Sequence, residues 1–158
     1  MPPHLLARRA ELVGAENMLQ PTAGYALGQL LHIRAVDGEP YITMIQHDAG
    51  KAFRSDWMRW ASLAGLPPHQ QTQREGGVRS DVDAEVWMRA KASYLAACEA
   101  VRDCHQAPLV WQAVETILMD DVLPPSWIDR SVAAAAVAAL RRGLDALAMH
   151  YRLIRRAR

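Results

Sequence analysis

Apolar side chains recur every three or four residues along several long stretches of this sequence, and no stretch alternates apolar with polar residues as a strand would. The recurrence places the apolar groups on one side of an α-helix. The pattern therefore predicts an all-α fold, with residues 1–158 forming a single compact domain of five or six helices. The expected helices cover residues 5–13, 24–33, 43–63, 81–104, 107–121 and 132–156, and the last is expected to be the longest.

Two of these stretches have especially clear apolar stripes. In the first, which contains DAGKAFRSDW (48–57), the stripe consists of Ile45, Ala49, Phe53, Trp57 and Trp60. In the second, it consists of Val86, Ala90, Tyr94, Ala97 or Cys98, and Val101. We expect Thr43 to cap the first of these helices. Asp56 lies at the edge of that helix's stripe, and because a partly buried carboxylate needs a partner, we expect it to pair with an arginine or to cap backbone groups.

Proline and glycine mark the breaks between the expected helices. VDGEP (36–40) predicts a turn, because Asp-Gly tolerates a positive φ and proline cannot continue a helix on its amino side. GLPPHQQTQREGGVRS (65–80) contains a proline pair, a glycine pair and almost no apolar residues. It predicts a mobile loop within the single domain.

The net charge of +1 conceals a strong segregation of charge along the chain. Residues 81–129 contain nine acidic and three basic residues, whereas residues 130–158 contain seven arginines and one acidic residue. The polar side of the expected last helix carries Arg141, Asp145, Met149, Arg152 and Arg156. Two interpretations remain open: the basic end meets phosphate or an acidic protein surface, or the two halves neutralise each other within the fold.

Residue types that often carry chemistry are present, but their spacing does not match known motifs. The close ligand pair of a structural zinc site is missing among Cys98, Cys104, His105 and His150. The acidic residues near 81–85 and 120–121 are explained by helix ends, and there is no glycine-rich phosphate loop or nucleophile elbow. We therefore expect no enzyme activity, no metal and no cofactor.

The aromatic and cysteine content indicates an ordinary intracellular core. Five tryptophans could stack on nucleotides, but four of them lie at or near the expected apolar stripes, which favours core packing. The two cysteines lie six residues apart in a helical stretch, where a bridge is awkward, so we expect reduced thiols. No apolar run reaches the roughly 18–20 residues of a membrane span. We expect a cytoplasmic protein with no membrane partner.

The carboxyl-terminal part has the outline of a degenerate helix-turn-helix: a helix, a tight turn, a shorter helix and a long basic helix. The usual glycine turn is missing, and alanines occupy the positions that would read bases. A DNA-binding transcriptional activator of this type is the alternative function. A helical interaction module without nucleic-acid contact is a third.

Four motifs occur in an order and at a spacing that resemble one family. They are LGQLL, DGEPYI, AGKAFRSDW and AALRRGLDALAMHYRL, and the similarity spans roughly residues 27–153. The chain resembles an alphaproteobacterial domain family that includes the carboxyl-terminal half of gene transfer agent activators of the GafA type and the separate antiterminator of the GafZ type. In the fused members a helix-turn-helix region precedes this domain, whereas here about 26 residues precede the resemblance.

The resemblance implies a regulator that binds RNA polymerase and switches on a gene transfer agent or prophage-like gene cluster, by processive antitermination or by activation. It further implies nascent RNA or DNA, a separate DNA-binding activator and elongation factors as possible partners, with the 65–80 loop ordering on the polymerase. Such a role suits a bipolar helical domain that offers cationic surface. The candidate contact residues are Lys51, Arg54, Arg59, Arg141, Arg142, Arg152, Arg155 and Arg156.

Overall fold

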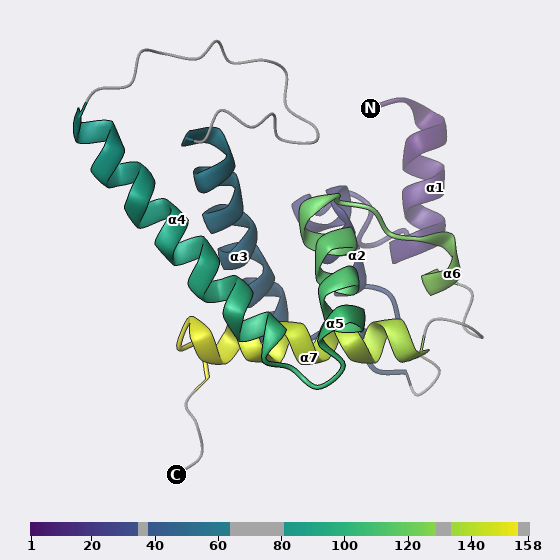
Figure 1. The fold of residues 1–158 in the computed structure, drawn as a ribbon. Coiled ribbons are helices and arrows are strands. Elements are labelled where there is room, and N and C mark those ends of the chain that lie inside the picture. The colour runs from purple at the N-terminus through teal and green to yellow at the C-terminus, as the bar shows by residue number, and fades with distance from the viewer. Residues whose placement is uncertain (35–37, 64–80, 129–133, 155–158) are drawn as a thin grey trace.

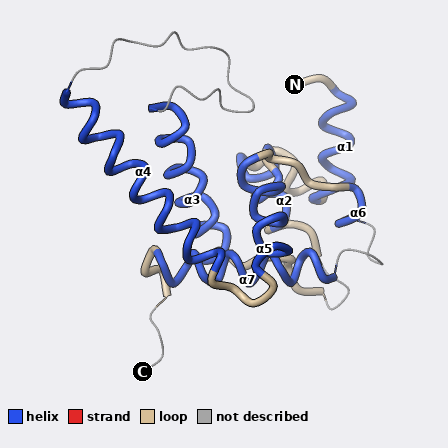
Figure 2. The backbone as a smooth tube through the Cα atoms, viewed as in Figure 1, coloured by secondary structure: helices blue, strands red, loops and turns tan. Residues whose placement is uncertain are grey.

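The computed structural model describes residues 1–34, 38–63, 81–128 and 134–154, and the regular structure in these ranges is helical, without a β-strand (Figures 1 and 2). The all-α prediction is confirmed. The described helices are α1 (Pro3–Val13), α2 (Ala26–Leu30), α3 (Met44–Leu63), α4 (Asp81–Arg102), α5 (Ala107–Val114), α6 (Pro125–Ile128) and α7 (Ala134–His150). A 3₁₀ turn, η1 (Pro21–Gly24), precedes α2, and a π-helical turn, η2 (Glu115–Met119), continues α5.

Helix α7 is the centre of the arrangement. Figure 1 shows α3 and α4 side by side and antiparallel, with α7 running across their lower ends and beneath α5. Helices α3, α4, α5 and α6 all contact α7. Because one helix is enclosed by four others, most of its side chains face protein.

The core follows the predicted apolar stripes. The largest fully buried side chains include Phe53 of α3, Val101 of α4 and the three leucines of α7, Leu140, Leu144 and Leu147. Val110, Val114, Ile117 and Leu118, predicted to point inward from the 107–121 helix, are fully buried as well.

Two glycines allow the helices around α7 to approach closely. A Cβ on Gly50 would lie 2.7 Å from a methyl of Leu27 and 3.1 Å from one of Leu144. A Cβ on Gly143 would lie 2.8 Å from Val114 Cγ2 and 2.9 Å from Val110 Cγ1. Real Cβ atoms essentially never approach another atom within 3.0 Å, so the crossing of α7 with α5 depends on the absence of a side chain at Gly143, and the packing of α3 against Leu27 of α2 depends on its absence at Gly50.

The amino terminus of α3 is capped as the sequence predicts. The backbone amide of Gln46 donates to Thr43 Oγ1 at 3.2 Å, and the backbone amide of Thr43 donates to the side-chain oxygen Oε1 of Gln46 at 2.9 Å. This reciprocal pair is a capping box, which satisfies two backbone donors that the helix cannot. The helix then continues to Leu63, close to its expected end.

Three sequence expectations are corrected. Ile45 and Val86, placed on buried stripes, are 46% and 45% exposed. Each lies in the first two turns of its helix, and Figure 1 shows the first half of α4 extending beyond α5 and α7. Among the described residues the last helix is also not the longest, because α7 has 17 residues and α4 has 22. Helix α7 ends early because Arg152 adopts a left-handed conformation, with φ 59°.

Some expectations fall on residues outside the described ranges. These are the 65–80 loop, the start of the last helix at Val132, part of the VDGEP turn, and Arg155 and Arg156. Gly38, at the described end of that turn, has a φ of 84°, as a turn glycine requires. None of the described helices combines the length and the apolar character needed to cross a lipid bilayer.

Candidate functional site

The solvent-facing side of α3 carries two of the basic candidates. Lys51 is exposed and makes no hydrogen bond or ion pair with the described residues. The Arg59 side chain is 61% exposed, and its Nη1 lies 3.9 Å from Asp56 Oδ1. Eight residues of helix separate the two positions by about 12 Å along the axis. Both charges are therefore available to a partner that approaches this side of α3.

Arg54, from the same helix, is committed to the fold. Its Nη1 lies 3.4 Å from Asp121 Oδ1, and its side chain is 28% exposed. The same Asp121 oxygen accepts a hydrogen bond of 2.8 Å from the Ala26 amide at the start of α2. Asp121 lies two residues after the π-helical turn η2 and has a φ of 55°. The pair joins α2, α3 and the end of η2, so this part of the charge is neutralised internally.

Asp56 lies near an arginine, Arg59, as the sequence predicts, and it also accepts hydrogen bonds from two hydroxyl groups. Its side chain is 12% exposed. Ser93 Oγ and the Tyr151 hydroxyl each donate a hydrogen bond of 2.8 Å to Asp56 Oδ2. Burial, and then the bond to Asp56, raise the pKa of Tyr151, which therefore stays protonated as the donor. One carboxylate thus connects α3, α4 and the end of α7, and Arg59 extends from this junction.

Arg141 points inward and not toward solvent. Its Nε donates to the Tyr41 carbonyl and its Nη2 to the Pro40 carbonyl, the latter at 3.2 Å. Tyr41 is itself buried, and its hydroxyl donates to the Trp127 carbonyl at 3.1 Å. The guanidinium therefore holds the segment before α3 against α7, because it donates hydrogen bonds to backbone carbonyls that have no partner within a helix.

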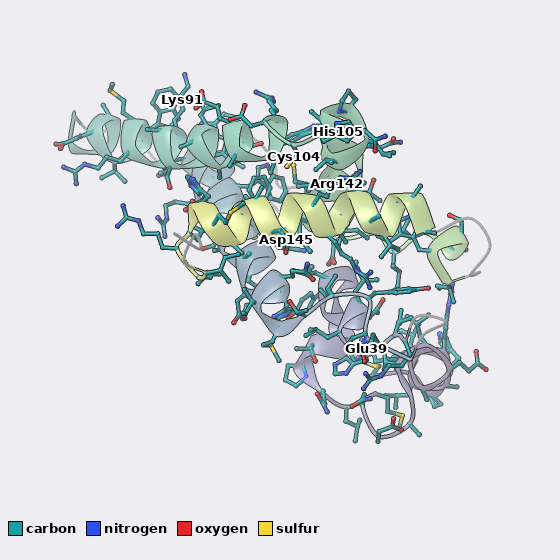
Figure 3. The ribbon with its side chains drawn as sticks, turned by 90° about the horizontal axis from the view of Figure 1, so that it is seen from below. Glu39, Lys91, Cys104, His105, Arg142 and Asp145 are labelled. Carbon is teal, nitrogen blue, oxygen red and sulfur yellow. The ribbon has the colours of Figure 1, made fainter. Side chains whose placement is uncertain are left out.

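Arg142 and Arg152 line an open groove of about 1060 Å³ between the carboxyl-terminal end of α4 and the carboxyl-terminal half of α7. Figure 3 shows four of its lining residues, Arg142 and Asp145 on α7 and Cys104 and His105 just after α4. Arg142 Nη2 donates to Gln106 Oε1 at 2.9 Å, while its Nε is buried without a hydrogen-bond partner. Arg152 is exposed and makes no hydrogen bond or ion pair with the described residues. The groove is also lined by Ala100, Asp103, Cys104, His105, Asp145, Ala146, Met149, His150 and Ile154.

The charge pattern left open whether the arginines of the last helix face outward, and in the described part of that helix they do not form an exposed row. Its exposed positions are Ala134, Ala135, Asp145 and Met149. Arginines 141 and 142 are only partly exposed, because neighbouring helices enclose α7. This enclosure does not favour insertion of α7 into a DNA groove, which would need a free face with polar side chains.

A polar cluster near the start of α3 has no equivalent among the sequence expectations. His47 is 3% exposed, and its Nε2 lies 2.7 Å from the Tyr25 hydroxyl. Burial lowers the pKa of His47, although the Asp48 carboxylate, 3.3 Å from Nδ1, acts in the opposite direction. His47 gave no signal in the sequence, because its partner Tyr25 lies 22 residues away.

The cysteines and tryptophans belong mainly to the packing. Cys98 is buried and Cys104 partly buried, both are free thiols, and burial raises the pKa of each. Across the described ranges, no three His, Cys, Asp or Glu side chains are grouped so that they could hold a metal ion. Trp57 is buried and Trp60 stacks on Tyr94 with ring centroids 4.9 Å apart, as predicted for core residues. Trp127, which lies outside the expected helices, is buried as well.

The basic candidates thus divide into exposed groups on α3 and at the groove, and arginines 54 and 141, which are bound within the fold. A scan of protein-family models finds no match to this chain, and searches of curated proteins and of solved structures find none either.

Proposed function

We propose that this protein is a transcription regulator that binds RNA polymerase and promotes expression of gene transfer agent or prophage-like genes, by processive antitermination or by activation. Its motifs support this proposal by meeting in space. AGKAFRSDW (49–57) supplies the core face of α3, DGEPYI supplies Tyr41, and AALRRGLDALAMHYRL supplies Arg141, which binds the Tyr41 carbonyl. Segments that resemble one family thus form one packed unit.

One observation carries the functional part of the proposal. Lys51, Arg59 and Arg152 remain exposed, while Arg54 and Arg141 are used internally. In a chain whose charges almost balance, exposed cations such as these three are suited to an acidic protein surface or to nucleic-acid phosphate. On this proposal α3 and the groove are contact surfaces, the protein acts in the cytoplasm, and it works beside a separate DNA-binding activator.

Retention of core RNA polymerase by the tagged full-length protein tests the proposal. We expect retention at low salt that weakens as salt is added, and read-through of a terminator that increases when elongation factors are also present. No retention, or unchanged read-through, would contradict it. Retention of duplex DNA without polymerase would favour the DNA-binding activator instead.

A double variant, Lys51→Gln with Arg59→Gln, tests the surface on α3. Both side chains are exposed, so the fold should persist, and Arg8→Gln on α1 serves as an exposed control. If these groups contact nascent RNA, the salt dependence of binding to the RNA-containing elongation complex should fall by about 0.7 per lost contact in log–log slope. An unchanged slope and affinity would remove this surface from the proposal.

A further inference from the structure

The solvent-facing side of α4 carries apolar residues where a surface helix normally carries polar ones. Met88 is 64% exposed and Leu95 is 41% exposed, and Ala92 between them is exposed as well. Because a helix turns by about 100° per residue, these side chains lie opposite Ala97, which is fully buried in the core. Figure 3 shows α4 along the edge of the molecule, with Lys91 on the side away from α7. None of the described helices covers this side of α4, since its side chains remain exposed.

The exposed stripe of α4 has the spacing of a coiled-coil seam. Alternating steps of three and four residues connect Glu85, Met88, Ala92, Leu95, Glu99 and Arg102, and all of them are exposed. This is the a and d repeat of a heptad, whose side chains pack against the same positions of another helix. The seam is apolar in the middle and charged at both ends, with Glu85 at one end and Arg102 at the other.

The charges of the seam match a second copy of the chain that runs in the opposite direction. When Ala92 is placed against Leu95 of the second copy, the small alanine leaves room for the larger leucine. In the same register Met88 lies beside Glu99 of the second copy. Glu85 then lies beside Arg102 of the second copy, and two-fold symmetry repeats this ion pair at the other end.

Other alignments of two α4 helices bring charges into unfavourable surroundings. A parallel pair would place Glu85 against Glu85 and Glu99 against Glu99, and like charges repel. An antiparallel pair shifted by one heptad would place Glu85 or Glu99 against Leu95 of the second copy, where a carboxylate loses water without gaining a partner. The charge pattern therefore favours one direction and one register.

The remaining basic groups of α4 leave this register open. Lys91 lies beside the seam, and its Nζ is 5.0 Å from the centroid of the Trp87 ring. This contact draws the ammonium toward the amino end of α4, away from the middle of the seam, where the second copy's ammonium would also approach. Arg102 lies over Trp111, 5.2 Å from the ring centroid, and makes no ion pair with the described residues. Its charge is therefore available to a carboxylate of another chain.

We propose that the protein forms an antiparallel homodimer, in which the outer sides of α4 from two copies pack against each other about a two-fold axis. This inference does not rest on the proposed function. The apolar middle of the seam is short, and two helices of this length bury less surface than a standard interface. We therefore expect a weak dimer, with a dissociation constant on the order of 10–100 μM.

Sedimentation of the full-length protein over a range of concentrations tests the dimer. We expect monomer and dimer in equilibrium for the wild type, and monomer for Leu95→Glu, which brings a carboxylate into the apolar middle. Met44→Glu is the matched control, because Met44 is 62% exposed on α3, and it should leave the association unchanged. A wild type that stays monomeric well above the expected dissociation constant would overturn the inference, and so would a dimer that persists in Leu95→Glu. Retention of polymerase is measured separately, so a monomeric wild type would leave the proposed function intact.

Reversal of the two end charges tests the direction and the register. Glu85→Arg and Arg102→Glu should each weaken the dimer roughly tenfold, because both symmetric ion pairs become like-charge pairs. The double variant Glu85→Arg with Arg102→Glu should recover the wild-type affinity. In a parallel dimer each single reversal would exchange one like-charge pair for another and leave the affinity unchanged. Unchanged affinity in the single variants, or no recovery in a double variant whose circular dichroism matches the wild type, would therefore overturn the inference.

Discussion

Replacing Asp56 should weaken the packing of α3, α4 and α7 against one another. The carboxylate is 12% exposed and accepts two hydroxyl hydrogen bonds of 2.8 Å, from Ser93 and Tyr151. Asp56→Ala removes the acceptor and leaves both hydroxyls facing an apolar gap. Asp56→Asn keeps the shape and one oxygen acceptor, but it removes the charge and replaces the second oxygen with an NH2 donor.

The expected size of the effect follows from the number and type of bonds lost. A hydrogen bond to a charged group contributes about 1.5–3 kcal/mol, and partial access of water to the freed hydroxyls reduces the loss. We expect Asp56→Ala to lower the free energy of unfolding by about 2–4 kcal/mol, and Asp56→Asn by about 1 kcal/mol. With a urea m-value near 2 kcal/mol/M, the alanine variant should unfold at a midpoint about 1–2 M lower.

A double-mutant cycle with Tyr151→Phe isolates one of the two bonds. We expect an interaction energy between positions 56 and 151 of about 1–2 kcal/mol in urea unfolding followed by circular dichroism. Ser93→Ala in place of Tyr151→Phe should give a second, separate coupling. If either cycle gives no coupling while Asp56→Ala still lowers the free energy of unfolding, the hydrogen bonds at this junction of α3, α4 and α7 do not explain the lost stability.

Three further changes test the fold and its pH dependence. Gly143→Val adds methyl groups where a Cβ alone would lie 2.8 Å from a valine methyl of α5, so overpacking should cost about 2–3 kcal/mol; an unchanged thermal midpoint would show that the crossing can relax. Thr43→Ala should cost about 1 kcal/mol in urea unfolding, and Thr43→Ser should recover most of it, unless the capping box does not form. Because burial lowers the pKa of His47, the folded state favours neutral histidine, and stability should fall as pH drops below the ordinary pKa of about 6.5. His47→Gln should reduce this fall between pH 7.5 and 5.5, and equal urea midpoint shifts in both proteins would contradict the assignment.

Local features of the sequence were sufficient for the helices and for much of the core. The Thr43 cap, the end of α3 at Leu63 and the inward side of α5 depend on neighbours within one or two turns, so periodicity and capping rules identify them. The errors at Ile45 and Val86 have a common cause. Periodicity tells which side of a helix is apolar, but not how far along the helix a neighbour covers that side.

The candidate site depended far more on contacts between distant parts of the chain. All the basic candidates look alike in sequence, yet Arg141 satisfies carbonyls about a hundred residues away, and Arg54 pairs with Asp121. Charge counts showed that the chain is bipolar, and they left open whether its arginines face outward. Packing around α7 answers this for the described residues. Because α7 is enclosed by its neighbours, Arg141 and Arg142 turn toward backbone and side-chain carbonyl oxygens, whereas Arg152, beyond the end of α7, stays exposed.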